Sequence, residues 1–112
     1  MDAPKGKPEV FVIGGNGKGI STYRKLQRRG IPFAAGILHK NDMDYEVAKV
    51  LAAQVAAEEP FEMISDETYQ KAKEIMETCS QVICCIDTFG PANEKNKDLM
   101  LLAKKAGKLV IN

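Results

Sequence analysis

The chain has 112 residues, of which 45% are hydrophobic and 28% charged, and its formal net charge is +1. These values are typical of one globular domain with a single core. They argue against binding of nucleic acid or of a membrane surface through overall charge, and no apolar stretch approaches the length of a membrane span.

The charges are unevenly distributed along the chain. Residues 1–40 carry eight Lys or Arg and two Asp or Glu, whereas residues 41–98 carry five and thirteen. A locally basic N-terminal third favours an anionic ligand, although a solvated helix face has the same composition. The basic residues at 24–29 have no interleaved aromatic residues, so they indicate a solvated face or a protein contact and not a nucleic-acid site.

Residues 1–8 contain two prolines and two lysines and are interpreted as a linker or an added tail. They lack the apolar core of a signal peptide. Residues 9–112 are then expected to form one domain.

The first half of this domain alternates strand and helix patterns. An apolar strand is predicted at 9–13, followed by a helix at 18–29 that ends at Gly30, a residue suited to a left-handed cap. A second strand follows at 33–38, and a second helix at 45–53. A short third strand is expected within residues 54–58, and residues 59–64 are interpreted as a connection.

The second half continues the alternation. Ser65 is a suitable N-cap for a helix in which Tyr69, Ala72, Met76 and Cys79 share one face. The unbroken apolar run at 81–86 predicts a strand that is buried on both faces. A helix is expected at 94–106, with Leu99, Leu102, Ala103 and Ala106 facing inward, and a last strand at 108–111.

This order of elements predicts an α/β fold. We expect a three-layer, Rossmann-like open parallel sheet of about five strands in the order 3-2-1-4-5, with helices on both faces. The first and fourth strands are then neighbours at the switch point of the sheet, where a cleft opens at their carboxyl ends.

A glycine-rich loop follows the first strand at this point. It comprises Gly14, Gly15, Asn16, Gly17, Lys18 and Gly19. The loop fails the Walker template because Lys18 precedes its last glycine, and it fails the dinucleotide template because Ile20 stands at the last glycine position. Backbone amides at a helix N-terminus still favour a phosphate or carboxylate, whereas the simpler interpretation is a loop that needs glycines only to turn.

Polar residues are expected at the same edge of the sheet. Asp42 and Asp44 follow the second strand, where they either cap a helix or bind a cation or hydroxyl groups. Asp87, Thr88 and Asn93 follow the fourth strand. Asp87 either accepts hydrogen bonds from a ligand or bonds the backbone of its own turn.

No catalytic or metal-binding set can be assembled from these residues. His39 is the only histidine, which excludes a histidine metal cluster. Cys79, Cys84 and Cys85 have no Cys-x-x-Cys spacing, and adjacent strand residues point to opposite faces. We interpret them as buried free thiols in a cytoplasmic protein.

Four segments together resemble a known family. They are FVIGGNG at 11–17, AGILHKNDMD at 35–44, FEMIS at 61–65 and FGPAN at 89–93. In this order they are similar to the domain found C-terminal to the ATPase in ABC transporter ATP-binding proteins that serve iron-siderophore, haem and cobalamin uptake. The resemblance covers nearly all of residues 9–112.

The resemblance implies a non-catalytic, ligand-sensing, regulatory or assembly domain of such a transporter protein. Its implied partners are the upstream ATPase domain of the same polypeptide, the transporter complex, a second copy of the chain and a small anionic ligand. It implies a cytoplasmic domain held at the membrane through that complex, with no membrane insertion of its own. The chain has no Walker-type ATP site, so no cofactor is assigned.

Two other functions stay open at this stage. One is a small enzyme acting on a nucleotide or sugar phosphate, with Asp87 and Lys18 in the cleft. The other is a pure interaction module whose helix faces bind the ATPase domain or a second copy.

Overall fold

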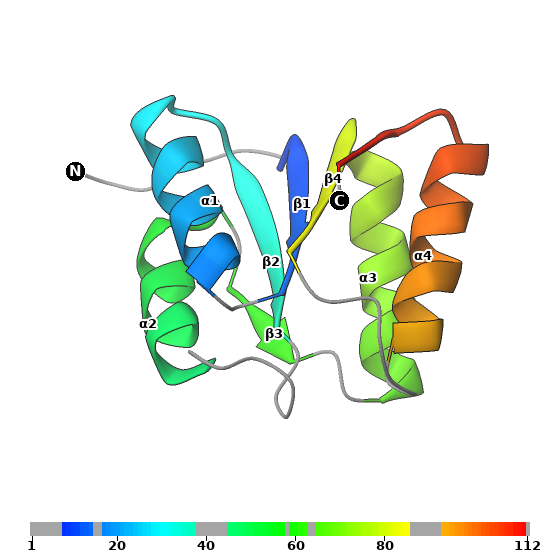
Figure 1. Cartoon of the computed structure of the whole chain (residues 1–112), viewed down its shortest axis with the longest axis horizontal. Coiled ribbons are helices and arrows are strands. Elements are labelled where there is room, and N and C mark those ends of the chain that lie inside the picture. The colour runs from blue at the N-terminus through cyan, green and yellow to red at the C-terminus, as the bar shows by residue number, and fades with distance from the viewer. Residues whose placement is uncertain are drawn as a thin grey trace.

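The computed structural model describes residues 8–14, 17–37, 45–57, 59–62, 65–85 and 93–111. Within these ranges strands and helices alternate along the chain (Figure 1). They are β1 (Val10–Ile13), α1 (Gly17–Arg28), β2 (Phe33–Ile37), α2 (Tyr45–Val55), β3 (Phe61–Glu62), α3 (Asp66–Thr78), β4 (Gln81–Cys84), α4 (Asn93–Lys105) and β5 (Leu109–Ile111).

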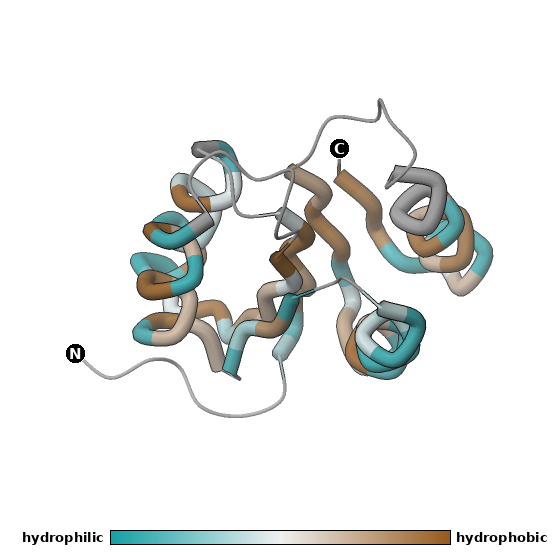
Figure 2. Tube along the Cα trace, turned by 90° about the horizontal axis from the view of Figure 1, so that it is seen from below, coloured by the Kyte–Doolittle hydropathy of each residue, from teal (hydrophilic) through white to brown (hydrophobic). Residues whose placement is uncertain are grey.

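The strands form one parallel sheet in the order β3-β2-β1-β4-β5. The predicted fold class and strand order are therefore confirmed. Helices α1 and α2 lie on one face of this sheet, and α3 and α4 lie on the other (Figures 1 and 2). No helix in the described part of the chain is both long enough and apolar enough to cross a membrane.

The central strand β1 divides the core into two halves. Phe11 and Ile13 pack with residues of α3 and α4, whereas Val10 and Val12 pack with residues of α1 and α2. All four are buried because both faces of β1 are covered by helices. This burial explains the continuous apolar run in the sequence, which is typical of central strands in parallel sheets.

Local signals determine where several helices begin and end. Gly30 has φ +67° as predicted, and the N–H of Ile31 donates to the Leu26 carbonyl in the arrangement of a Schellman cap. Gly107 ends α4 in the same way, with φ +78°. At the start of α3, Ser65 and Thr68 form a reciprocal capping box, which confirms the predicted N-cap.

The predicted boundary between α2 and β3 is wrong. Helix α2 continues to Val55, because Val55 and Ala56 extend the buried face formed by Ala48 and Ala52. The third strand is consequently Phe61–Glu62, inside the segment expected to be a connection. Phe61 pairs in register with Gly36, and its ring stacks on Phe11 at a centroid distance of 6.1 Å.

The predicted burial of β4 and of α4, which lie toward the β5 side of the sheet, is also partly wrong. Strand β4 alternates in burial, with Val82 and Cys84 buried and Gln81 and Ile83 only partly buried. On α4, Leu99 and Ala103 are buried as expected, but Leu102 is 44% exposed and Ala106 is exposed. Gln81 and Ile83 of β4 lie on a face of the sheet that the described helices cover only in part, and α4 lies beside the edge strand β5.

Candidate functional site at the switch point

The predicted switch point is present between β1 and β4. These two strands pair from Val10↔Gln81 to Ile13↔Cys84, and α1 begins at Gly17, only four residues after β1 ends at Ile13. Beyond β4, the N–H of Cys85 donates to the Ile13 carbonyl at 2.8 Å. The carboxyl ends of β1 and β4 therefore form one edge, where ligands of open α/β sheets usually bind.

Gly14 turns the chain away from the sheet at this edge. Its φ is +106°, in the region that favours glycine, and the residue is buried. Its N–H donates to the Gly36 carbonyl at 2.7 Å, which continues the pairing with β2 by one residue. Its carbonyl accepts a hydrogen bond of 2.8 Å from the Tyr23 hydroxyl.

Tyr23 is the residue that connects this turn to the core, and the sequence interpretation did not single it out. Its side chain is fully buried and its ring stacks on Phe33 at a centroid distance of 5.4 Å. The hydroxyl then reaches Gly14 across the first turns of α1. A buried tyrosine hydroxyl needs a hydrogen-bond partner. A tyrosine on the inner face of the first helix was therefore the sequence signal that could have indicated this contact.

The beginning of α1 has the electrostatic character of an anion site. Its first turn contains no acidic residue, so no side chain there compensates the positive end of the helix dipole. Lys18 is exposed at this end. Gly19, in the first turn of α1, is buried.

Thr22 lies one turn further along α1 and faces β4. Its hydroxyl donates to the Lys18 carbonyl at 2.8 Å and lies 3.7 Å from the thiol sulfur of Cys85. Cys79, Cys84 and Cys85 are all buried, as predicted, and none of them forms a disulfide. Among the described residues no group of three or more His, Cys, Asp or Glu is placed to hold a metal ion.

The structure brings together only part of the predicted site. Gly14, Gly17, Lys18 and Gly19 are at the switch-point edge, as the sequence pattern predicted. Asn93 is described only as the first residue of α4. The remaining predicted residues lie outside the described ranges: Gly15, Asn16, Asp42, Asp44, Asp87 and Thr88.

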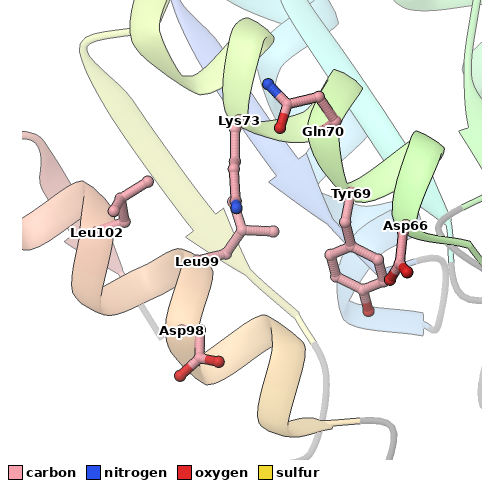
Figure 3. Close-up of a pocket in the computed structure, with 7 residues that line it drawn as sticks. All are labelled: Asp66, Tyr69, Gln70, Lys73, Asp98, Leu99 and Leu102. Carbon is pink, nitrogen blue, oxygen red and sulfur yellow. The ribbon is translucent and has the colours of Figure 1, made fainter.

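A separate hollow lies between α3 and α4, on the face of the sheet opposite to α1 (Figure 3). Its volume is about 360 Å³. It is lined by Asp66, Tyr69, Gln70, Lys73, Asp98, Leu99 and Leu102. Its lining mixes one lysine with two carboxylates, so it lacks the single sign of charge that the N-terminus of α1 presents.

The fold and the loop define a Rossmann-like α/β domain with its candidate site at the switch point. Residues 33–112 match the MJ0874 family, and the chain belongs to this family. It is similar to the uncharacterized protein MJ0874 of Methanocaldococcus jannaschii, with 35% identity over 75 residues that cover 67% of this chain and 81% of the relative. No solved structure matches significantly. The family match begins at the first residue of β2, so β1 and the glycine loop precede it.

Proposed function

We propose that this chain is a non-catalytic regulatory domain of an ABC transporter ATP-binding protein, and that it binds a small anionic ligand at its glycine loop. The observation that carries the ligand site is the geometry at Gly14 and the start of α1. A buried glycine with φ +106° turns the chain at the β1–β4 switch point, and a helix without acidic residues in its first turn begins three residues later.

The charge distribution supports an anion as the ligand. The dipole of a helix places about half a positive charge at its N-terminus, and free backbone N–H groups there point at the ligand. Lys18 adds a full positive charge at the same position and is exposed. A phosphate or carboxylate group is the chemical class that this arrangement favours.

The hydrogen bonds around the loop support a binding role over a catalytic one. The hydroxyl groups of Tyr23 and Thr22 each have a structural partner. The Tyr23 hydroxyl donates to the Gly14 carbonyl, and the Thr22 hydroxyl donates to the Lys18 carbonyl. The first contact joins Gly14 to α1 and the second lies within α1, which suits a site that is formed before the ligand arrives.

The transporter context is supported by the resemblance of the four sequence segments. The segment at 35–44 includes the end of β2, and the segment at 61–65 includes β3, the strand that pairs with it. The resemblance suggests the ATPase domain of an importer for iron complexes, haem or cobalamin as partner, a second copy of the chain in the assembled transporter, and a cytoplasmic location. The full reading frame tests this context directly. Walker motifs encoded upstream in the same polypeptide support it, whereas an upstream region of unrelated fold argues against it.

A thermal-shift screen tests the ligand site. The isolated chain is heated with inorganic phosphate, ATP, ADP, a corrinoid and a ferric siderophore. A ligand present at one hundred times its Kd stabilises the folded state by about 2.7 kcal/mol and raises the Tm. We expect an increase with at least one anion.

Two variants of α1 show whether such an increase arises at the loop. Lys18→Glu places a negative charge at the N-terminus of α1 and is expected to abolish the shift. Lys25→Glu makes the same change of charge at an exposed position two turns later and should retain it. A shift that both variants retain equally, or no shift with any anion, contradicts the proposed site.

A further inference from the structure

One part of the sheet is covered only in part by helices in the described structure. On the face occupied by α1 and α2, these helices pack mainly on β1 and β2. The next strand, β4, is only partly buried on this face at Gln81 and at Ile83, which packs against the core beneath these two helices. The edge strand β5 is more open still, with Leu109 60% exposed and Ile111 44% exposed.

The register shows that these four residues form one continuous surface. Gln81 pairs with Leu109 and Ile83 pairs with Ile111, so their side chains share one face of the sheet. Between them, Val82 and Val110 point to the opposite face, where Val82 is fully buried and Val110 packs against the core beneath α3 and α4. Figure 2 shows β5 as an apolar strand that ends at the C-terminal label. We call Gln81, Ile83, Leu109 and Ile111 the open sheet face.

A basic stripe of α1 borders the open sheet face. Lys18, Thr22 and Lys25 of α1 are spaced by four and three residues, which places them on one side of the helix. Arg29 directly follows the last residue of α1 and continues this side, since its N–H donates to the Lys25 carbonyl. The contact between Thr22 and Cys85, the residue after β4, shows that this side faces β4. The three charged residues of the stripe are exposed, and α1 contains no acidic residue.

We propose that the open sheet face is the docking surface for an amphipathic helix of a partner protein. The apolar side of that helix covers Ile83, Leu109 and Ile111, and acidic residues along one flank lie beside the basic stripe of α1. The proposal does not depend on the ligand at the glycine loop.

The dimensions and the charges favour a helix as the occupant. Two neighbouring strands span about 10 Å, which is close to the diameter of one helix with its side chains. Parallel sheets are normally covered by helices on both faces, and the described elements cover this position only in part. A second copy of the chain would bring a basic stripe of its own toward the first, so charge complementarity favours a partner with acidic residues instead.

Two synthetic helical peptides provide the test. They share an apolar face of leucines, and one has glutamates along one flank where the other has lysines. Each is titrated into isotopically labelled protein while backbone amide shifts are followed by NMR. We expect the glutamate peptide to shift the amides of β4, β5 and α1. It should bind about fivefold more tightly than the lysine peptide, because two or three exposed ion pairs contribute modestly.

Matched variants of the protein locate the contact. Leu109→Ser combined with Ile111→Ser should abolish binding of the glutamate peptide. Leu101→Ser is the control, since Leu101 is 55% exposed on the outside of α4, similar to the exposed fraction of Leu109. Lys25→Glu combined with Arg29→Glu should reverse the preference, so that the lysine peptide binds more tightly.

Three results would overturn the proposal. One is binding of neither peptide to the folded wild-type protein. Another is binding that maps to α3 and α4 or that survives the serine substitutions. The third is self-association of the wild-type protein in sedimentation velocity that the serine substitutions abolish, because the open sheet face then belongs to a second copy.

Discussion

Gly14 combines a turn of the backbone with two hydrogen bonds, one to β2 and one to α1. Its φ of +106° lies outside the left-handed helical region, near φ +57°, that asparagine adopts most readily. Gly30, with φ +67°, lies inside that region and has open space around the position of a Cβ atom. The two glycines therefore differ in what can replace them.

We predict that Gly14→Asn lowers the free energy of unfolding by about 1–3 kcal/mol, because a side chain there forces a strained backbone. Gly30→Asn is the matched control and is expected to lower the free energy of unfolding by less than about 1 kcal/mol. Urea denaturation of both variants measures the difference. Equal losses would show that the conformation at Gly14 has no special requirement for glycine.

Tyr23 gives a second prediction at the scale of single residues. Tyr23→Phe keeps the stacking on Phe33 but removes the hydrogen bond to the Gly14 carbonyl. We expect a loss of about 1–2 kcal/mol in the free energy of unfolding, since the buried carbonyl loses this partner. Unchanged stability together with unchanged amide exchange at Gly14 would show that the hydrogen bond contributes nothing.

Among the elements, α3 shows how local sequence can determine a boundary. Ser65 accepts from the Thr68 N–H, and the Thr68 hydroxyl accepts from the Ser65 N–H at 2.9 Å. We predict that Ser65→Ala lowers the free energy of unfolding by about 1 kcal/mol. Ser21→Ala is the control, because Ser21 is exposed in the interior of α1, where alanine has the higher helix propensity. Chemical denaturation checks both variants, and an equal effect of the two contradicts a capping role for Ser65.

The elements that sequence could not predict are those that depend on distant contacts. Strand β3 has two residues, and its only clear local signal is the apolar Phe61, whose strand pairing comes from β2 and whose ring packs on Phe11. The half-open β4 was missed for a similar reason. Residues 82–86 are all apolar, but whether helices cover both faces of β4 is decided by the packing of elements that are distant in the sequence.

At the scale of the whole molecule, topology explains why the candidate site could be located from sequence. The alternation of strands and helices led to the order β3-β2-β1-β4-β5, and that order puts the glycine loop at the switch point. The contacts that stabilise the loop were not predictable in the same way. The hydroxyl of Tyr23 and the carbonyl of Gly36 reach Gly14 from other elements, and only their packing brings them there.

An NMR titration shows whether the N-terminus of α1 binds a small anion. Isotopically labelled protein is titrated with the anion that raises the Tm most, at constant ionic strength, with chloride as the reference salt. We expect saturable shifts of the backbone amides of Gly17, Lys18 and Gly19, and their loss in Lys18→Glu but not in Lys25→Glu. Shifts confined to the hollow between α3 and α4, or shifts no larger than those caused by chloride, would contradict an anion site at the N-terminus of α1.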